Sequence, residues 1–277
     1  MEDVDRHPSI RGIVDHASRW PAVRRMLQAR YERRFLAHDS TMRNLYRGVY
    51  PSFTEAQASI PRTSMQGYDN TESAGFYRER TRRVFLNDYP MMWWLSRLFE
   101  AGSSSVFDLG GHIGIAYYAY QRFMRFPAQL RWRVMDVPAV MEAGAIWAGK
   151  NDALHRLQFT GKRSDADGVD ILFAAGSLQY LDYTLADLLA SLSKPPSHLL
   201  LNSVPIHISV SYFTVQNTGV SCCPYRVTAE GDFIGGLKAL GYVVRDRWEN
   251  TDRQCEIPFY PAHSLDRYFG YYLSRED

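Results

Sequence analysis

The chain has few cysteines, and their spacing is irregular. Cys222, Cys223 and Cys255 are an odd number with one adjacent pair, which suits neither a disulfide framework nor a zinc site. We therefore expect no metal centre and a reducing compartment, the cytoplasm. The opening residues, MEDVDRHPSI, are polar and charged, so we also expect no signal peptide.

The chain also lacks a charge excess of either sign and a long apolar run. Its 32 basic and 30 acidic residues give a net charge of +2, whereas nucleic-acid-binding proteins usually carry a basic excess. The arginines of residues 19–35 are interpreted as a solvated helix face. No window reaches the roughly 18 apolar residues of a membrane helix. We therefore expect no nucleic-acid or membrane partner, and MMWWLSRLF (91–99) predicts a helix on the core or at a homodimer face.

Two parts of the chain differ in their patterns. Residues 1–45 are rich in Arg, Ala and Leu and predict one or two helices, whereas residues 46–75 contain many turn-forming Pro, Gly and Asn residues. Residues 76–101 predict a further helix with a break near its proline. We therefore predict an N-terminal helical lid or cap at 1–103 and a main domain at 104–277.

Strand and helix patterns alternate along the main domain. Such alternation is typical of a mainly parallel sheet with helices on both faces. The last two predicted strands are joined by about 16 residues without a helix pattern, and should therefore pair antiparallel. The predicted fold class is α/β, a Rossmann-like, doubly wound, mostly parallel seven-stranded sheet with an antiparallel last strand, plus the N-terminal helical lid. The predicted strands are 106–110, 130–137, 154–161, 169–178, 198–206, 241–250 and 267–275.

A glycine turn follows the first of these strands, in VFDLGGHIG (106–114). Gly110 and Gly111 form the predicted turn, and Gly114 lies in the first turn of the next helix. Glycine permits close approach of a ligand to the backbone, and the helix start provides free N–H groups. Asp108, at the strand end, suits an ammonium or hydroxyl group better than a phosphate. The G-G-x-x-G spacing also differs from the dinucleotide motif.

Polar residues follow two further strands of the predicted sheet. Asp136 ends the second strand, at the position of the ribose ligand in nucleoside-binding doubly wound sheets. Gly176, Ser177 and Tyr180 follow the fourth strand, in AAGSLQY. Since ligands bind outside the carboxyl ends of the strands in such sheets, these residues and the glycine turn predict one shared crevice.

Together these features resemble the class I S-adenosylmethionine (SAM)-dependent methyltransferases. The segments GVYPSFTEA, GYDN, FDLGGHIGIAYY, ILFAAGSLQYL, NSVPI, FTVQN and GYYLSR resemble a bacterial family of methyltransferase-like proteins over roughly residues 46–275. Azetidine-2-carboxylate synthases are similar to this family, and they cyclise the aminobutyrate part of SAM with release of 5'-methylthioadenosine. The resemblance implies a SAM-consuming transferase of small-molecule, specialised metabolism.

The resemblance also implies roles for individual residues. The three glycines of the turn would line the methionine and ribose side, and Asp108 would hold the amino group. Asp136 would bind the ribose hydroxyls, with Val137 against the adenine, although many family members carry the longer Glu at the ribose position. Ser164 and Asp165 lie where such enzymes often hold the adenine amine.

Further residues are candidates for the crevice. Gly176 and Ser177 are expected to contact the cofactor, and Tyr68, in GYDN, is expected in a lid that closes over it. The Tyr180 ring is a candidate to hold the sulfonium, an interaction of about 0.5–2 kcal/mol, although a core position under the next helix is the alternative.

Two chemistries are compatible with this crevice. Methyl transfer to a small acceptor is the leading hypothesis, with Asn202 and Ser203 as polar groups that orient the nucleophile. Transfer to a hydroxyl usually requires a general base, and His207 is a candidate, although a surface position is the alternative. Intramolecular cyclisation of SAM requires no acceptor and is the second hypothesis. A non-catalytic SAM-binding module is the third.

Overall fold

A computed structural model describes residues 21–37, 44–61, 69, 78–219 and 221–276. Its larger sheet has seven strands, and their order is β10-β11-β6-β5-β2-β3-β4. Only β11 runs antiparallel to its neighbours. The predicted fold class and the antiparallel pairing of the last two strands are therefore confirmed. In sheet order the strands are β10 (Tyr242–Asn250), β11 (Tyr268–Arg275), β6 (His198–Val204), β5 (Ile171–Ala175), β2 (Ser105–Leu109), β3 (Arg131–Met135) and β4 (Leu157–Phe159).

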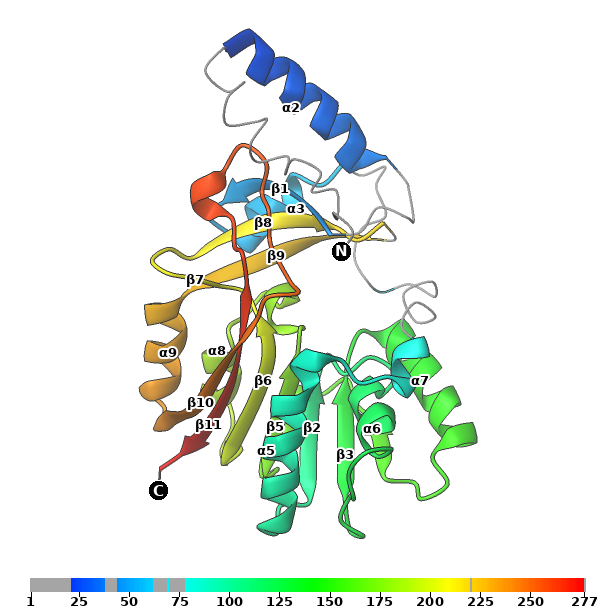
Figure 1. Ribbon diagram of the computed structural model, residues 1–277. Helices are drawn as coiled ribbons and strands as arrows, with labels where there is room; N and C mark the ends of the chain where they lie inside the picture. The colour runs from blue at the N-terminus through cyan, green and yellow to red at the C-terminus, as the bar shows by residue number, and fades with distance from the viewer. Residues whose placement is uncertain (1–20, 38–43, 62–68, 70–77, 220, 277) are drawn as a thin grey trace, which may run out of the picture.

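Helices cover both faces of this sheet (Figure 1). All five residues of β2 are buried, because successive side chains point to opposite faces. Val106 packs in the layer of helices α5 to α7, whereas Phe107 and Leu109 pack in the layer of α8 and α9. The five helices are α5 (Tyr89–Glu100), α6 (Ile115–Tyr120), α7 (Pro138–Asn151), α8 (Leu185–Ala190) and α9 (Glu230–Lys238).

A second, four-stranded sheet lies above the carboxyl ends of the main sheet in Figure 1. It was not predicted, because residues 207–229 carried no predicted strand and residues 46–75 were interpreted as turn-rich. Its first strand contains Gly48, whose φ is +71°, and it pairs with a strand more than 150 residues further along the sequence. In sheet order the strands are β1 (Leu45–Tyr50), β8 (Tyr212–Asn217), β9 (Cys222–Ala229) and β7 (Ile206–His207).

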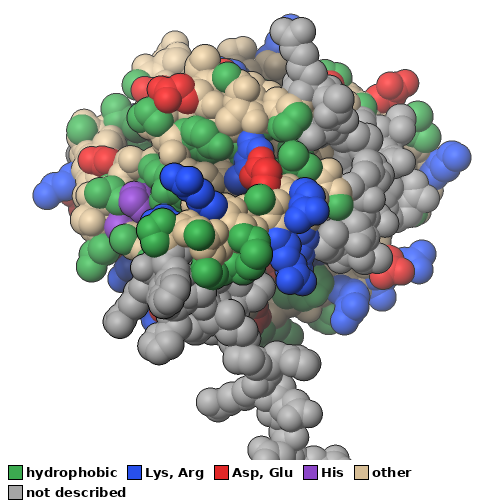
Figure 2. All heavy atoms as spheres, turned by 90° about the horizontal axis from the view of Figure 1, so that it is seen from above, with side chains coloured by type: hydrophobic (Ala, Val, Ile, Leu, Met, Phe, Trp, Pro, Cys, Tyr) green, Lys and Arg blue, Asp and Glu red, His purple; other side chains and the backbone are tan. Residues whose placement is uncertain are grey.

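Helix α2 (Pro21–Leu36) carries the arginine run of the N-terminal part. Phe35 is its only buried residue, and its arginines are exposed, which confirms the predicted solvated face. Viewed from this end of the molecule, basic side chains are interspersed with acidic and apolar ones (Figure 2). The short helix α3 (Phe53–Ala58) follows β1, and the Ser52 hydroxyl accepts a hydrogen bond from the N–H of Glu55 at its start.

Two short 3-10 turns, η1 (Arg78–Arg82) and η2 (Leu86–Asp88), precede α5. The break predicted near Pro90 is the start of this helix, where the missing N–H of proline removes no hydrogen bond. Met91 and Leu95 are fully buried, so the apolar stretch belongs to the core, as predicted. No helix among the described residues is long and apolar enough to cross a membrane.

The loop between β10 and β11 joins the two sheets. Cys255 and Ile257 of this loop pack with Tyr46 of β1 and Tyr225 of β9 in one buried cluster. This packing places residues 251–254 above the end of the main sheet. The remaining short turns are η3 (Arg163–Ala166), η4 (Leu178–Tyr180) and η5 (Pro261–His263).

Candidate active site

A cavity of about 240 Å³ lies at the carboxyl ends of the central strands. From β2 the chain continues to β3 and β4 on one side, and it returns to β5 and β6 on the other. Ligands of open α/β sheets bind at such a reversal of strand order. Asp108, Gly110, Gly111 and Ser203, four of the predicted site residues, line this cavity.

The glycine turn forms the floor of the cavity. A Cβ atom at Gly111 would lie 2.3 Å from the Asp108 carboxyl, and one at Gly110 would lie 2.2 Å from Cβ of Ser177. The Ser177 hydroxyl donates a hydrogen bond to the Leu109 carbonyl, and this bond stabilises the glycine turn. Gly114 has a φ of +88° at the start of α6, and its Cβ position faces Leu157, away from the cavity lining. The floor therefore presents backbone atoms instead of side chains.

Asp108 is the most deeply buried acid of the cavity, with 1% of its surface exposed. Its Oδ2 accepts a hydrogen bond of 2.9 Å from the indole Nε1 of Trp132. Burial raises the pKa of Asp108 to about 7, against the effect of this hydrogen bond, and the charge of Asp136 raises it further. A cation placed beside Asp108 would favour its ionised form.

Asp136 lies at the end of β3, beside the glycine turn. Its two carboxylate oxygens accept hydrogen bonds of 2.8 Å from the N–H groups of His112 and Val137. Burial raises its pKa. Val137 packs against Ile113 and Val140. The carboxylate thus connects the exits of β2 and β3, and neither Asp136 nor Val137 is part of the cavity lining.

The segment predicted as a lid lies mostly outside the described residues, Tyr68 included. Its Asp69 is described, and the Asp69 Oδ1 accepts a hydrogen bond of 2.7 Å from the N–H of Ala139 in the first turn of α7. The negative charge of Asp69 contributes to the raised pKa of Asp136. This part of the N-terminal region therefore lies beside the predicted ribose position.

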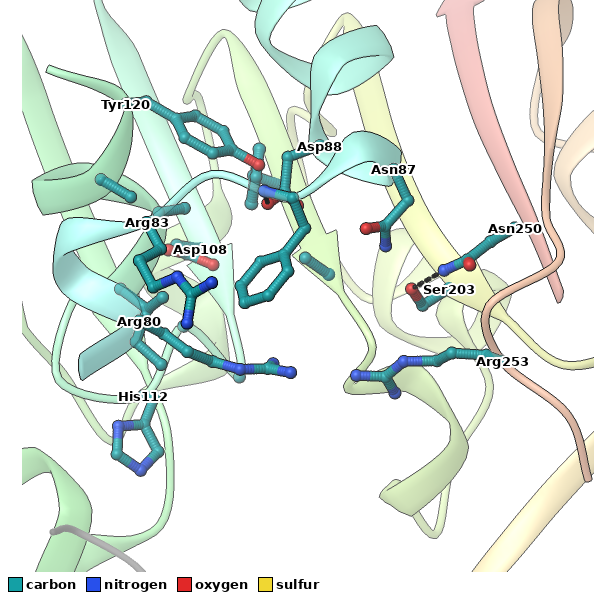
Figure 3. Close-up of a pocket in the computed structure, with 18 of the residues that line it drawn as sticks. Arg80, Arg83, Asn87, Asp88, Asp108, His112, Tyr120, Ser203, Asn250 and Arg253 are labelled. Carbon is teal, nitrogen blue, oxygen red and sulfur yellow. Dashed lines mark hydrogen bonds between the residues drawn. The ribbon is translucent and has the colours of Figure 1, made fainter. Parts of the chain in front are cut away.

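A second acid of the cavity, Asp88, is half-buried and lies near Tyr120 (Figure 3). Its Oδ2 accepts a hydrogen bond of 2.9 Å from the N–H of Phe85, and it also bonds the Tyr120 hydroxyl. Burial raises the pKa of Asp88. Arg80 and Arg83 lie beside it, with their guanidinium carbons 5.0 and 5.8 Å from the centre of the Phe85 ring.

The far wall consists of Ser203, Asn250 and Arg253 (Figure 3). The Asn250 side-chain amide donates a hydrogen bond of 3.1 Å to the Ser203 hydroxyl. Ser203 has a φ of +56°, and His112, across the cavity, has the same value. Such backbone conformations are costly for residues other than glycine and cluster at functional sites.

Asn202 lies behind this wall instead of on it. Its amide donates a hydrogen bond of 2.8 Å to the Asn87 carbonyl, and its Oδ1 accepts one of 3.2 Å from the indole of Trp248. It therefore connects β6 to η2 and to β10. Asn202 is not part of the cavity lining.

Four predicted residues have other surroundings. The Tyr180 hydroxyl donates a hydrogen bond of 2.7 Å to Gln216 Oε1, and its ring packs edge-on against Tyr225 at 5.3 Å. Asp165 accepts a hydrogen bond of 2.6 Å from the Thr160 hydroxyl. Ser164 and Asp165 belong to η3 and are not part of the cavity lining. His207 bonds backbone groups of neighbouring loops through both ring nitrogens.

The cavity also contains residues that the sequence did not single out. Among them, Asp88 precedes an apolar helix and is indistinguishable in sequence from an ordinary helix-start acid. Arg80, Arg83, Asn250 and Arg253 belong to no local motif. Gly176, which was predicted, lies beside Arg253, since a Cβ there would be in van der Waals contact at 3.6 Å from Arg253 Nη1. Among the described residues, no three His, Cys, Asp or Glu side chains gather where they could hold a metal ion.

Comparisons with known proteins find similarity in structure only. No protein-family model matches the chain, and no curated protein matches it. The magnesium protoporphyrin IX methyltransferase of Synechocystis PCC 6803, solved with bound SAM, is 12% identical, with a TM-score of 0.47 over 76% of this chain and 93% of that one. A glycopeptide N-methyltransferase solved with S-adenosylhomocysteine is 10% identical, with a TM-score of 0.46 over 75% and 99%.

A mitomycin 7-O-methyltransferase is 15% identical, with a TM-score of 0.43. The match covers 81% of this chain but only 61% of the mitomycin enzyme. Function must therefore be inferred from the residues around the cavity.

Proposed function

We propose that the chain binds SAM in this cavity and transfers its methyl group to a small acceptor. The observation that carries the proposal is the buried carboxyl of Asp108, with a pKa raised to about 7, beside a floor of bare backbone at Gly110 and Gly111. Such a carboxyl gains most from a ligand that brings its own positive charge. The side chain of Arg83 lies on the same side of the cavity (Figure 3).

An acid and a guanidinium on one side of a cavity suit the two charges of an amino acid head group. In this assignment Asp108 holds the ammonium of SAM, and Arg83 holds its carboxylate. Asp136 binds the ribose hydroxyls, as the resemblance implies, and Asp69 brings the N-terminal segment to this edge. When bound, SAM supplies an electrophilic methyl carbon next to its sulfonium.

The residues around the cavity then position the acceptor and exclude water. Asp88 is a carboxyl on the cavity wall whose pKa is raised by burial, and a carboxylate in this place can receive the proton of an acceptor hydroxyl. Ser203 and Asn250 form a hydrogen-bonding wall opposite Asp108 (Figure 3). In this proposal Asp108 binds the cofactor, and Asp88 receives the proton of the acceptor.

Intramolecular cyclisation of SAM is the second candidate. It requires an uncharged amine, and an acid with a pKa of about 7 at the amino position, Asp108, can receive the proton of the ammonium. The bound substrate would then need no acceptor. The same residues bind SAM in both candidates, so product analysis must distinguish them.

The test is incubation of the purified protein with SAM, with and without a panel of small acceptors, followed by chromatography of the products. S-adenosylhomocysteine that forms only with an acceptor supports methyl transfer. 5'-Methylthioadenosine and a four-membered amino acid from SAM alone would replace it with cyclisation. SAM that binds but stays intact in every mixture would indicate the non-catalytic module, and absence of SAM binding by calorimetry would contradict the proposal as a whole.

A further inference from the structure

Arg253 places a positive charge on the far wall of the cavity. Its guanidinium extends toward that of Arg80 from the opposite side (Figure 3). Within the described part of the chain, no hydrogen bond or ion pair holds the Arg253 guanidinium, although Asp88 and Asp252 line the same cavity. The charge of Asp88 interacts with both guanidinium groups, and a further anion in this part of the cavity would be attracted by Arg253.

The surroundings of Arg253 hold this charge in place. Behind it lies a cluster of buried tyrosines in which Tyr225 donates a hydrogen bond of 2.7 Å to the Tyr268 hydroxyl, and Tyr46 lies 3.2 Å from the same oxygen. Arg253 is charged at neutral pH, and burial raises the pKa values of Tyr225, Tyr268 and Tyr46, so these phenol groups are neutral there. The tyrosines bond one another, so the guanidinium remains available to a ligand.

The neighbours of Arg253 suit a carboxylate. The Ser203 hydroxyl accepts a hydrogen bond from Asn250, so its own proton is available for donation. A guanidinium fork with a nearby hydroxyl donor matches the two oxygens of a carboxylate, because Arg binds that group through two parallel N–H bonds.

A single bound SAM cannot occupy both sides through one carboxylate. The ammonium and carboxylate of an amino acid share one carbon, so the group that Asp108 binds keeps its carboxylate near Asp108 and Arg83. Arg253 lies across the cavity from Asp108, next to Ser203 (Figure 3). It therefore lies apart from the head group of SAM and can bind a second molecule.

We infer that Arg253 and Ser203 bind a carboxylate of the methyl acceptor, which makes the acceptor class a small hydroxy acid instead of a neutral alcohol. This inference rests on the proposed function. Methyl transfer would then form a bond between the acceptor oxygen and the methyl carbon, break the carbon–sulfur bond, and leave the hydroxyl proton on Asp88.

The test uses calorimetry on the full chain saturated with S-adenosylhomocysteine. The probes are two matched pairs: 4-hydroxybenzoate with 4-hydroxybenzamide, and lactate with lactamide. We expect the wild-type protein to bind at least one acid tenfold or more tightly than its amide. Arg253→Met should abolish this preference and leave S-adenosylhomocysteine affinity within twofold. Arg83→Met, the matched control, should weaken S-adenosylhomocysteine about tenfold and keep the preference for the acid.

Arg253→Lys provides a second variant that keeps the charge, in case the Met variant is poorly folded. It should retain part of the preference. Equal binding of acids and amides by the wild-type protein would overturn the inference. So would a loss of S-adenosylhomocysteine affinity in the Arg253 variants equal to that of Arg83→Met, because Arg253 would then belong to the cofactor. Failure of the wild-type protein to bind S-adenosylhomocysteine at all would instead refute the proposed function on which the inference rests.

Discussion

An aspartate lies at each end of strand β2, and the two acids differ in their hydrogen-bond donors and in their pKa. At the amino end, Asp170 Oδ2 accepts hydrogen bonds of 2.8 and 2.9 Å from the N–H groups of Ser104 and Ser105, and one of 2.7 Å from the Ser105 hydroxyl. Burial alone would raise the pKa of Asp170, but these hydrogen bonds lower it overall. At the carboxyl end, Asp108 accepts a hydrogen bond from the indole of Trp132, and burial raises its pKa to about 7.

The difference separates a structural acid from a functional one. Asp170 joins β2 to β5 and is stabilised in its charged form by the fold itself. Asp108 lies beside a cavity, and there the fold disfavours the charged form of the carboxyl. Strongly raised pKa values of buried acids in clefts mark functional sites for this reason.

Asp108→Asn tests the functional end of the comparison and should have the largest effect. We expect SAM affinity to fall by about 100-fold or more, because the ammonium loses its charged partner. The apo protein should become more stable at pH 8, since ionisation of a carboxyl with a raised pKa opposes folding. In the wild-type protein, the loss of folding stability from Asp108 is absent below pH 4 and grows as the pH rises toward 7. Above pH 7 it is on the order of 4 kcal/mol. Calorimetry and thermal unfolding at pH 4 and pH 8 would measure both effects, and a variant destabilised at pH 8 would contradict this account.

Gly111→Ala tests whether the floor must be free of side chains. The new Cβ would lie 2.3 Å from the Asp108 carboxyl, closer than any real contact, so the acid must move. We expect SAM affinity to fall about tenfold or more, which a binding titration would detect. Gly149→Ala in α7 is the matched control, because nothing lies within 4 Å of its Cβ position. It should leave binding unchanged and stabilise the helix by about 0.5–1 kcal/mol.

The pH dependence of SAM binding should reveal the raised pKa of Asp108 directly. Below a pH of about 7 the carboxyl is protonated in the apo protein, and binding the ammonium must release that proton. Affinity should therefore fall by up to about tenfold for each pH unit below 7. Calorimetry in buffers of different ionisation enthalpy would count the released proton. A SAM affinity that does not change between pH 5 and pH 8 would indicate that the ammonium does not bind Asp108.

Asp170→Asn should have the smallest effect on binding. We expect SAM affinity to change by less than about twofold, while the free energy of unfolding at neutral pH falls by about 1–3 kcal/mol through the lost charged hydrogen bonds. Because the pKa of Asp170 is lowered in the folded protein, this stabilisation is present above its ordinary pKa and is lost as pH falls through its lowered value. Chemical denaturation at pH 7 would measure it. A large loss of SAM affinity here would remove the contrast between the two acids.

The cavity floor and Ser203 could be predicted from sequence, whereas Asn250 and Arg253 of the far wall could not. Asp108, Gly110 and Gly111 are near neighbours in one motif, so local geometry brings them together whenever a strand precedes a helix. Arg83, Ser203 and Arg253 come from three distant segments. Their meeting depends on the loop between β10 and β11 and on the 3-10 turns before α5, which carry no periodic signal.

The amino-acid sequence by itself determined the alternation of strands and helices, the antiparallel pairing of the last two strands and the glycine turn with its acid. These features depend on apolar periodicity and on residues that are adjacent in the chain. Only the tertiary structure decided that β1, β8 and β9 form a second sheet, that Tyr180 lies away from the cavity lining, and that Arg253 reaches it. It also decided the chemistry of Asp108, because a pKa depends on burial and on donors such as Trp132, which the fold brings from another strand.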